Sequence, residues 1–267
     1  MTLDEALEVT KIHSIYGLLS PGDIIHHRPF RMPHHTASDI ALIGGGSVPK
    51  GGEVTLAHHG ILFLDELPEF NRRTLEVLRQ PLEDHVVTIA RAHKTMRFPC
   101  QFMLIAAMNP CPCGWRTSQQ RPCTCSGLEV QRYLSKISGP LVDRIDIHIQ
   151  VPALKPAELF DTHTAEPSAA IKKRASQCRL LQQERLKTEG IHANAQMNAR
   201  QVKKYCNLES EGRNLLKMAV DKTGLSARAY DKILKVARTI ADLEQKEQIT
   251  AAHLAEAIGY RTLDRIK

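Results

Sequence analysis

The chain has 267 residues, 42% of them hydrophobic and 24% charged, which is the composition of an ordinary globular protein with one large or two modest domains. No apolar run approaches the roughly 18 residues that a membrane span needs. Seven cysteines in a chain of this length do not indicate a disulfide framework, and the acidic start has no signal-peptide layout, so we expect a cytoplasmic protein.

The net charge of +7 is unevenly distributed along the chain. Residues 1–153 hold 15 Lys and Arg against 15 Asp and Glu, whereas residues 154–267 hold 21 against 14. A basic half indicates an anionic partner such as nucleic acid or nucleotide phosphate. A solvated helical surface is the alternative, which charge alone leaves open.

In the first half, runs of strand length alternate with short helical segments, which predicts an α/β domain. Residues 60–64 and 102–108 are continuously apolar, as strands buried on both faces are. Between them, Asn71 caps a predicted helix. Three leucines share one face of this helix: Leu75, Leu78 and Leu82.

Two further segments of this half differ from the strand and helix pattern. Residues 86–98 begin with β-branched side chains and contain a basic tip, which predicts a hairpin. Residues 28–55 are rich in Gly, Pro and His, and we predict an extended loop or insertion outside the core.

The second half has helical patterns. A long helix is predicted to begin with Ser168 as its cap and to stop at Gly190. Residues 226–243 place apolar side chains on one face, and Thr250 caps a last helix. We therefore predict an all-helical second domain over residues 154–267.

Polar residues stand next to three predicted strands, at the end of two and before the third. Asp65 and Glu66 directly follow the apolar run 60–64, as in a Walker B motif. Such a strand brings an aspartate that can hold Mg²⁺, and a glutamate that can polarise an attacking water, to the edge of a parallel sheet. The alternative is a strand that ends in a solvated acidic turn. Asn109 ends the next run, and Arg144 precedes another predicted strand.

Several stretches resemble the magnesium-chelatase-like ComM/YifB family of AAA+ ATPases, in the order that the family has them. They are residues 31–35 (RMPHH), 60–70 (GILFLDELPEF), 107–114 (AMNPCPCG), 225–230 (LSARAY) and 236–243 (VARTIADL). The resemblance covers nearly the whole chain. It implies an AAA+ parallel-sheet core over residues 1–153 and a helical lid over residues 154–267.

The resemblance also implies roles for single residues, with ATP and Mg²⁺ as cofactors. Asp65 and Glu66 match Walker B, and Asn109 matches sensor 1, which orients the attacking water. Arg144 matches the arginine finger that reaches a neighbouring subunit's nucleotide, a task that suits a planar, permanently charged guanidinium. Arg228 matches sensor 2, although a surface helix residue is the alternative there.

Two segments match parts of the family that line the pore of a hexameric ring. Residues 86–98 fall where the family has its pre-sensor-1 hairpin, and residues 28–56 resemble its helix-2 insert. Arg91, His93 and Lys94 at the hairpin tip are therefore candidate DNA contacts. A solvated basic tip is the alternative.

One family motif is missing from the sequence. No Gly-x-x-x-x-Gly-Lys-Ser/Thr loop occurs, and residues 44–51 have the wrong spacing and no Ser or Thr after the lysine. Relatives carry this Walker A loop upstream of a segment that resembles residues 3–9. We therefore expect a chain truncated at its start, a sheet with an unpaired edge, and a phosphate loop supplied by an upstream polypeptide.

Four cysteines form two Cys-x-Cys pairs separated by nine residues: Cys111, Cys113, Cys123 and Cys125. Four thiolates in so short a loop can complete a tetrahedral zinc site that braces the loop after sensor 1. Unlinked thiols, an iron–sulfur site and disulfides are the alternatives.

Adjacent histidines recur at residues 26–27, 34–35 and 58–59. Because neighbouring residues of a strand point to opposite faces, we predict that these pairs form hydrogen bonds in loops and do not chelate metals. Residues 34–35 are expected near the pore.

The resemblance implies ATP-driven DNA remodelling, such as helicase or branch-migration activity in natural transformation, by a homo-oligomeric ring. Two alternatives stay open. One is a magnesium-chelatase motor subunit of tetrapyrrole synthesis, which predicts an integrin-like partner. The other is a nucleotide-free DNA-binding or assembly fragment, which the missing Walker A loop favours.

Overall fold

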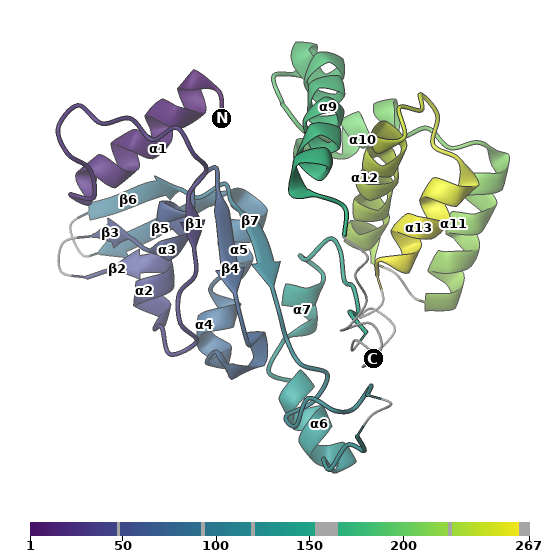
Figure 1. Cartoon of the computed structure of the whole chain (residues 1–267), viewed down its shortest axis with the longest axis horizontal. Helices are drawn as coiled ribbons and strands as arrows, with labels where there is room; N and C mark the ends of the chain where they lie inside the picture. The colour runs from purple at the N-terminus through teal and green to yellow at the C-terminus, as the bar shows by residue number, and fades with distance from the viewer. Residues whose placement is uncertain (47–48, 92–93, 119–120, 153–164, 224–225, 262–267) are drawn as a thin grey trace. The chain divides into compact units, whose positions relative to one another are not determined.

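A computed structural model describes residues 1–46, 49–91, 94–118, 121–152, 165–223 and 226–261. The chain divides into two compact units, Met1–Arg144 and Ile145–Lys267, and each is described by itself (Figure 1). The domain boundary expected between residues 153 and 154 lies within residues 153–164, which are outside the described residues. None of the described helices is long and apolar enough to cross a membrane.

The centre of the first unit is a parallel sheet of three strands in the order β1-β4-β7 (Figure 1). The strands are β1 (Phe30–Arg31), β4 (Ile61–Leu64) and β7 (Met103–Ala106). Leu62 and Leu64 of the central strand are fully buried. The two strands predicted from apolar runs, and their parallel pairing in an α/β domain, are confirmed. The burial on both faces expected for residues 102–108 is wrong, since three of the four residues of β7 are exposed.

Strand β7 has a neighbour on one side only among the described strands. Met103 is 62% exposed and Ile105 is 40% exposed, although both are apolar. An edge strand of this kind presents unpaired backbone groups beside exposed hydrophobic side chains. The sheet therefore has an edge to which a further strand can be added.

The helical segment between β4 and β7 consists of two short helices, α4 (Arg72–Glu76) and α5 (Arg79–Asp84). The side chain of Asn71 accepts a hydrogen bond from the backbone of Arg73, which confirms the predicted cap. The predicted leucines face the core: Leu75, Leu78 and Leu82.

The Gly-rich segment contributes to the core, so the prediction of a loop outside it is wrong. Its elements are α2 (Asp39–Ile43), β2 (Gly44–Gly45), β3 (Lys50–Gly51) and α3 (Glu53–Leu56). Leu42 and Val54 have no exposed surface. One-turn helices between glycines are enough to bury these side chains, and composition averaged over the whole segment hides such short apolar stretches.

Helix α1 (Leu3–Ile15) begins with a capping box between Thr2 and Glu5. Strands β5 (Val86–Arg91) and β6 (Lys94–Pro99) form the predicted antiparallel hairpin.

Helices α6 (Gly127–Leu134) and α7 (Gly139–Val142) follow β7. No strand follows Arg144 among the described residues, contrary to our prediction, and His148 makes an isolated bridge with Arg261 instead.

The second unit is helical, as predicted. Its helices are α9 (Ser168–Leu186), η2 (Lys187–Glu189), η3 (Asn194–Gln196), α10 (Ala199–Tyr205), α11 (Ser210–Thr223), α12 (Ala227–Leu243) and α13 (Ala251–Gly259). Ser226 and Thr250 cap their helices, and Gly190 adopts the left-handed conformation expected of a stop. Pro167, and not Ser168, is the cap of α9, because Ser168 is already the first helical residue.

A buried ionic network lies in the core of this second unit. Asp242 is 2% exposed and Arg238 is 4% exposed. Asp242 accepts hydrogen bonds from Arg238 Nε at 3.1 Å and from Asn194 Nδ2 at 2.8 Å, and it pairs with Arg185. The carboxylate thus has a partner on every side, which buried charges require.

Candidate active-site edge of the parallel sheet

The two predicted acids lie at the carboxyl end of the central strand. Leu64 pairs with Ala106 in the last register position of β4 and β7, so both strands end at the same edge. Just beyond it, the backbone N–H of Leu67 donates to the carbonyl of Ala107 at 2.9 Å and ties the turn to β7. Asp65 therefore begins its turn beside the segment that leads to Asn109.

Glu66 has an uncommon backbone conformation for a residue other than glycine. Its φ of 51° and ψ of 46° are left-handed helical, and its side chain is 54% exposed. A residue held in this region costs about 1–3 kcal/mol and persists only where its surroundings impose it. The turn therefore presents an acidic side chain to solvent at an energetic cost, which is typical of functional positions.

His35, which our sequence analysis did not assign to this site, contacts Glu66. Its Nδ1 lies 3.1 Å from Oε2 of Glu66. The imidazole also packs edge-on against Phe70, with ring centroids 6.4 Å apart. His35 follows β1, the strand beside β4, and this position in the neighbouring strand's loop is the signal that could have identified it.

Asp65 has the exposure and the chemistry of a cation ligand. It is exposed and its Oδ1 accepts a hydrogen bond from the backbone of Glu66 at 2.9 Å. In the part of the chain that the structure describes, no cationic side chain pairs with it. Oxygen ligands such as carboxylates are the ones that Mg²⁺ prefers, so Asp65 has the chemistry of a magnesium ligand.

Asn109 is exposed and lies where the chain folds back on itself. A Cβ atom added to Gly114 would lie 3.9 Å from the amide carbon of Asn109, so the following loop returns to this side chain. Burial raises the pKa of Tyr133 of α6, and the backbone of Asn109 lies close enough to oppose that rise. Asn109 therefore rests between the loop and α6.

Arg144 is directed toward its own chain. Its side chain is 11% exposed and pairs with Glu83. Its guanidinium also donates to the carbonyl oxygens of Arg79 at 3.1 Å and Pro140 at 2.7 Å. To reach a neighbouring subunit, Arg144 would have to leave these partners.

The other predicted contacts are described only in part. Arg228 is exposed in the first turn of α12, in the second unit. Arg91 and Lys94 face each other across the hairpin. Their side chains and the whole of His93 lie outside the described part of the structure.

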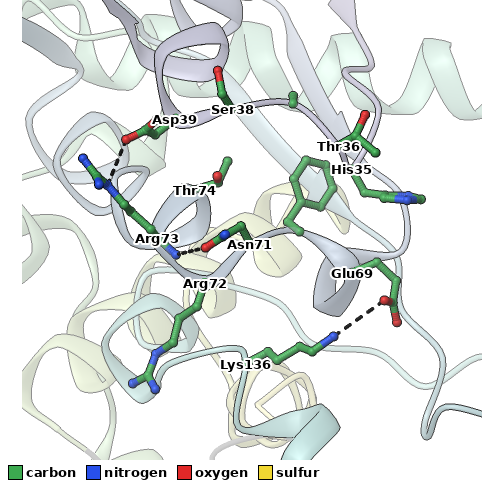
Figure 2. Close-up of a pocket in the computed structure, with 12 residues that line it drawn as sticks. His35, Thr36, Ser38, Asp39, Glu69, Asn71, Arg72, Arg73, Thr74 and Lys136 are labelled. Carbon is green, nitrogen blue, oxygen red and sulfur yellow. Dashed lines mark hydrogen bonds and ion pairs between the residues drawn. The ribbon is translucent and has the colours of Figure 1, made fainter.

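A pocket adjoins the His35 side of this edge (Figure 2). Its walls carry both signs of charge. Arg73 pairs with Asp39 at 3.0 Å, and Lys136 lies 3.6 Å from Glu69, as the dashed lines in Figure 2 mark. Arg72 also lines the pocket, so its walls hold three cationic side chains (Arg72, Arg73 and Lys136) against two acidic ones (Asp39 and Glu69).

The four cysteines of the loop between β7 and α6 lie together, and we refer to them as the cysteine cluster: Cys111, Cys113, Cys123 and Cys125. All four Sγ atoms lie within 4.8 Å of one another. Backbone groups of Trp115 and then Thr124 form hydrogen bonds to Cys113 and lower the pKa of its thiol to about 5.

One adjacent histidine pair does converge, because it occupies a turn and not a strand. His58 and His59 both direct Nε2 at Oε2 of Glu8, at 3.1 and 2.8 Å. The backbone N–H of Gln101 donates to Nδ1 of His58, so Nε2 of that ring carries the proton and donates to Glu8. The predicted hydrogen bonds are present at His58 and His59, but the reason given against chelation, opposite faces of a strand, is wrong, since Glu8, His58 and His59 bring their ligand atoms within 4.8 Å of one another.

Comparison with known proteins agrees with this arrangement. The family described as magnesium chelatase, subunit ChlI, matches residues 1–159, and the family described as its C-terminal part matches residues 165–261. The chain is 44% identical over 271 residues to competence protein ComM of Haemophilus influenzae and 42% identical over 264 residues to uncharacterized protein YifB of Escherichia coli. It is 38% identical over 260 residues to uncharacterized protein Rv2897c of Mycobacterium tuberculosis.

These alignments cover 100%, 98% and 96% of the chain, respectively, and 51% of each relative. The chain therefore spans about half the length of the curated relatives it matches.

Proposed function

Because the chain belongs to the magnesium chelatase subunit ChlI family, whose members are AAA+ ATPases, we propose that it forms part of an ATP-hydrolysing motor related to competence protein ComM. The observation that carries this proposal is the pairing of β4 with β7, which brings the turn of Asp65 and Glu66 beside the segment of Asn109. This edge of a parallel sheet is where α/β proteins bind nucleotides.

In this proposal Asp65 would hold Mg²⁺, which would supply positive charge against the phosphate oxygens. Glu66 accepts a proton at its carboxylate from the attacking water. His35 is a positioning residue, since its Nδ1 lies 3.1 Å from Oε2 of Glu66 and fixes the direction of that carboxylate. The exposed position of both acids supports access by a ligand.

Three further residues complete the proposed machinery. Asn109 orients the water through its amide. Arg144 neutralises charge on the nucleotide of a neighbouring subunit in a homo-oligomeric ring, after exchanging Glu83 for phosphate oxygens. Arg228 contacts the γ-phosphate from the helical unit.

A phosphate-binding loop would come from another segment or polypeptide, because the sequence has no Walker A motif. The exposed edge of β7 is the proposed place where the strand leading to that loop docks. Backbone pairing would supply the affinity, and Met103 and Ile105 would be covered.

We further propose DNA as the substrate on which the motor acts, with helicase or branch-migration activity. Support comes from the similarity to a competence protein and from the basic second half of the chain. Arg91, His93 and Lys94 are the proposed hairpin contacts. The second candidate, a chelatase motor of tetrapyrrole synthesis, is favoured by the family name alone and predicts activity that DNA does not stimulate.

The test is ATP binding and hydrolysis by the chain, alone and mixed with the part of the Haemophilus influenzae relative that it does not cover, each with and without DNA. We expect no turnover by the chain alone and DNA-stimulated turnover by the mixture. Tight nucleotide binding by the chain alone would reveal a phosphate site of another kind. A mixture that binds together without turnover would instead support an assembly fragment.

A further inference from the structure

The sulfur atoms of the cysteine cluster have the spacing of ligands around one ion. Cys111 Sγ lies 3.4 Å from Cys113 Sγ and 3.7 Å from Cys123 Sγ, and the latter two are 3.6 Å apart. A tetrahedral zinc site with Zn–S bonds of about 2.3 Å separates its sulfurs by about 3.8 Å. The cluster is thus close to the size of a site that surrounds a single metal.

We propose that the cysteine cluster binds one Zn²⁺ through four thiolates and that the ion holds Asn109 in place. The zinc site itself stands whether or not the chain hydrolyses ATP. Its second part rests on the proposed function, because Asn109 matters there as the residue that orients water.

The loop around the cluster has little else to order it. Among the described residues 110–118 and 121–126, only Cys111 is buried. Loops of this length without secondary structure are uncommon in compact domains. Because apolar burial is nearly absent, metal binding is the interaction that can offset the conformational entropy of ordering this segment.

The geometry favours a single tetrahedral metal ion over a disulfide and over a polynuclear iron–sulfur cluster. A disulfide needs its sulfurs about 2.05 Å apart, and the sulfurs here are in mutual van der Waals contact instead. A polynuclear iron–sulfur cluster places irons and sulfides among its thiolates and so holds them farther apart. Four sulfur ligands with tetrahedral spacing suit one metal ion, either zinc or a single iron, and the measurement of metal content separates these two.

The ion would act on the sheet edge through a short path. Cys111 follows Asn109 by two residues, and Gly114 returns the loop to the Asn109 amide. Gly114 has a φ of 79°, which lets the chain reverse between the first cysteine pair and Trp115. On the other side, Ser126 caps α6, whose Tyr133 meets the backbone of Asn109. Zinc would therefore tie both ends of the loop to Asn109.

The first test measures metal content. We expect elemental analysis of the purified chain to find about one zinc per chain, and cobalt substitution to give the absorption bands of a tetrahedral tetrathiolate site. Cys113→Ser should lose the metal, whereas Cys178→Ser, the same change at a buried cysteine of α9, should keep it. No stoichiometric metal, stoichiometric iron, or disulfides found under non-reducing conditions would overturn the zinc site. Zinc release from the unmodified chain by a thiol-modifying reagent provides the same test if Cys113→Ser fails to fold.

The second test measures the link to Asn109 without any activity assay. Hydrogen exchange of the peptide from Met108 to Gly114 should become faster when the metal is removed by a chelator, and slow again when zinc is restored. Exchange in β5 and β6 serves as the internal control and should not change. Zinc that binds stoichiometrically while exchange near Asn109 stays the same would overturn the bracing role and leave the zinc site intact.

Discussion

Carboxylates in the two units of the molecule differ in their exposure to solvent and in the number of their partners. Asp242 in the helical unit is 2% exposed and surrounded by Arg238, Arg185 and Asn194. Glu66 at the sheet edge is 54% exposed, has His35 as its partner and sits on a strained backbone. A charge that stabilises a fold is buried and fully paired, whereas a charge kept for a ligand is exposed and sparsely paired.

The largest expected effect is the loss of stability on replacing the buried carboxylate of Asp242. Asp242→Ala leaves the buried Arg238 without its charged partner and should lower the free energy of unfolding by about 3–5 kcal/mol. Denaturant unfolding followed by circular dichroism measures this. Asp65→Ala, at an exposed carboxylate, should change stability by less than about 0.5 kcal/mol. Equal losses of unfolding free energy in the two variants would contradict the distinction between the buried and the exposed carboxylate.

Replacing the exposed carboxylate of Glu66 should lower turnover and leave stability unchanged. Glu66→Gln removes the proposed proton acceptor and should lower kcat of the ATP-hydrolysing mixture by about 10²- to 10⁴-fold. The unfolding curve should stay the same, because no buried partner is lost. Glu69→Gln, at an exposed acid of the same turn, is the matched control and should retain turnover. A Glu66→Gln variant with normal turnover would remove Glu66 from the mechanism.

Replacing the partner of Glu66 should have a smaller effect. His35→Ala should lower kcat about tenfold and leave KM unchanged, since groups that orient a functional residue have effects of this order. His35→Asn keeps a polar group near the position of Nδ1 and should restore part of the rate. A higher kcat in His35→Ala would mean that His35 holds the Glu66 carboxylate in an orientation that does not support hydrolysis.

The contact between Glu8 and its two histidines should make the first unit sensitive to acid. Hydrogen bonds from His58 and then His59 lower the pKa of Glu8 below its ordinary 4.5. The ionised Glu8 therefore stabilises the fold above pH 4.5, and this stabilisation is lost as the pH falls through the lowered pKa. Burial lowers the pKa of His58 below 6.5, so the unfolded chain takes up that proton first and stability falls as the pH drops below 6.5. Both shifts act in the same direction.

Unfolding midpoints from pH 7.5 to pH 4 measure this sensitivity. Glu8→Gln should cost about 0.5–1 kcal/mol at neutral pH, the range of a solvent-exposed pair, and should flatten the decline near pH 4. Lys11→Gln on the same helix should leave the profile unchanged. A stability that rises on acidification would contradict the assigned protonation of His58.

The smallest effect concerns the strained turn. Glu66→Gly removes a side chain from a left-handed position and should leave stability unchanged or raise it by up to about 1 kcal/mol. Turnover should be lost as in Glu66→Gln. A clear loss of stability would show that the Glu66 side chain helps to hold the fold.

Much of the local structure could be predicted because its causes are local. The strand before Asp65, the hairpin and the caps at Asn71, Ser226 and Thr250 depend on apolar runs and on side chains within a few residues. The Gly-rich segment was predicted wrongly because the burial of Leu42 and Val54 depends on partners far along the chain. The missing strand after Arg144 is a long-range error of the same kind, since His148 finds its partner at Arg261.

The sequence by itself determined the acidic pair after an apolar strand, the spacing of the cysteine cluster, the order of the family's motifs and the helical second half. Each of these is a pattern over neighbouring residues. Only the tertiary structure decided that His35 meets Glu66, that Arg144 turns to Glu83, and that the cysteine loop returns to Asn109. These contacts join residues on different elements, and their geometry is fixed by strand pairing and by the packing of side chains, which no local pattern encodes.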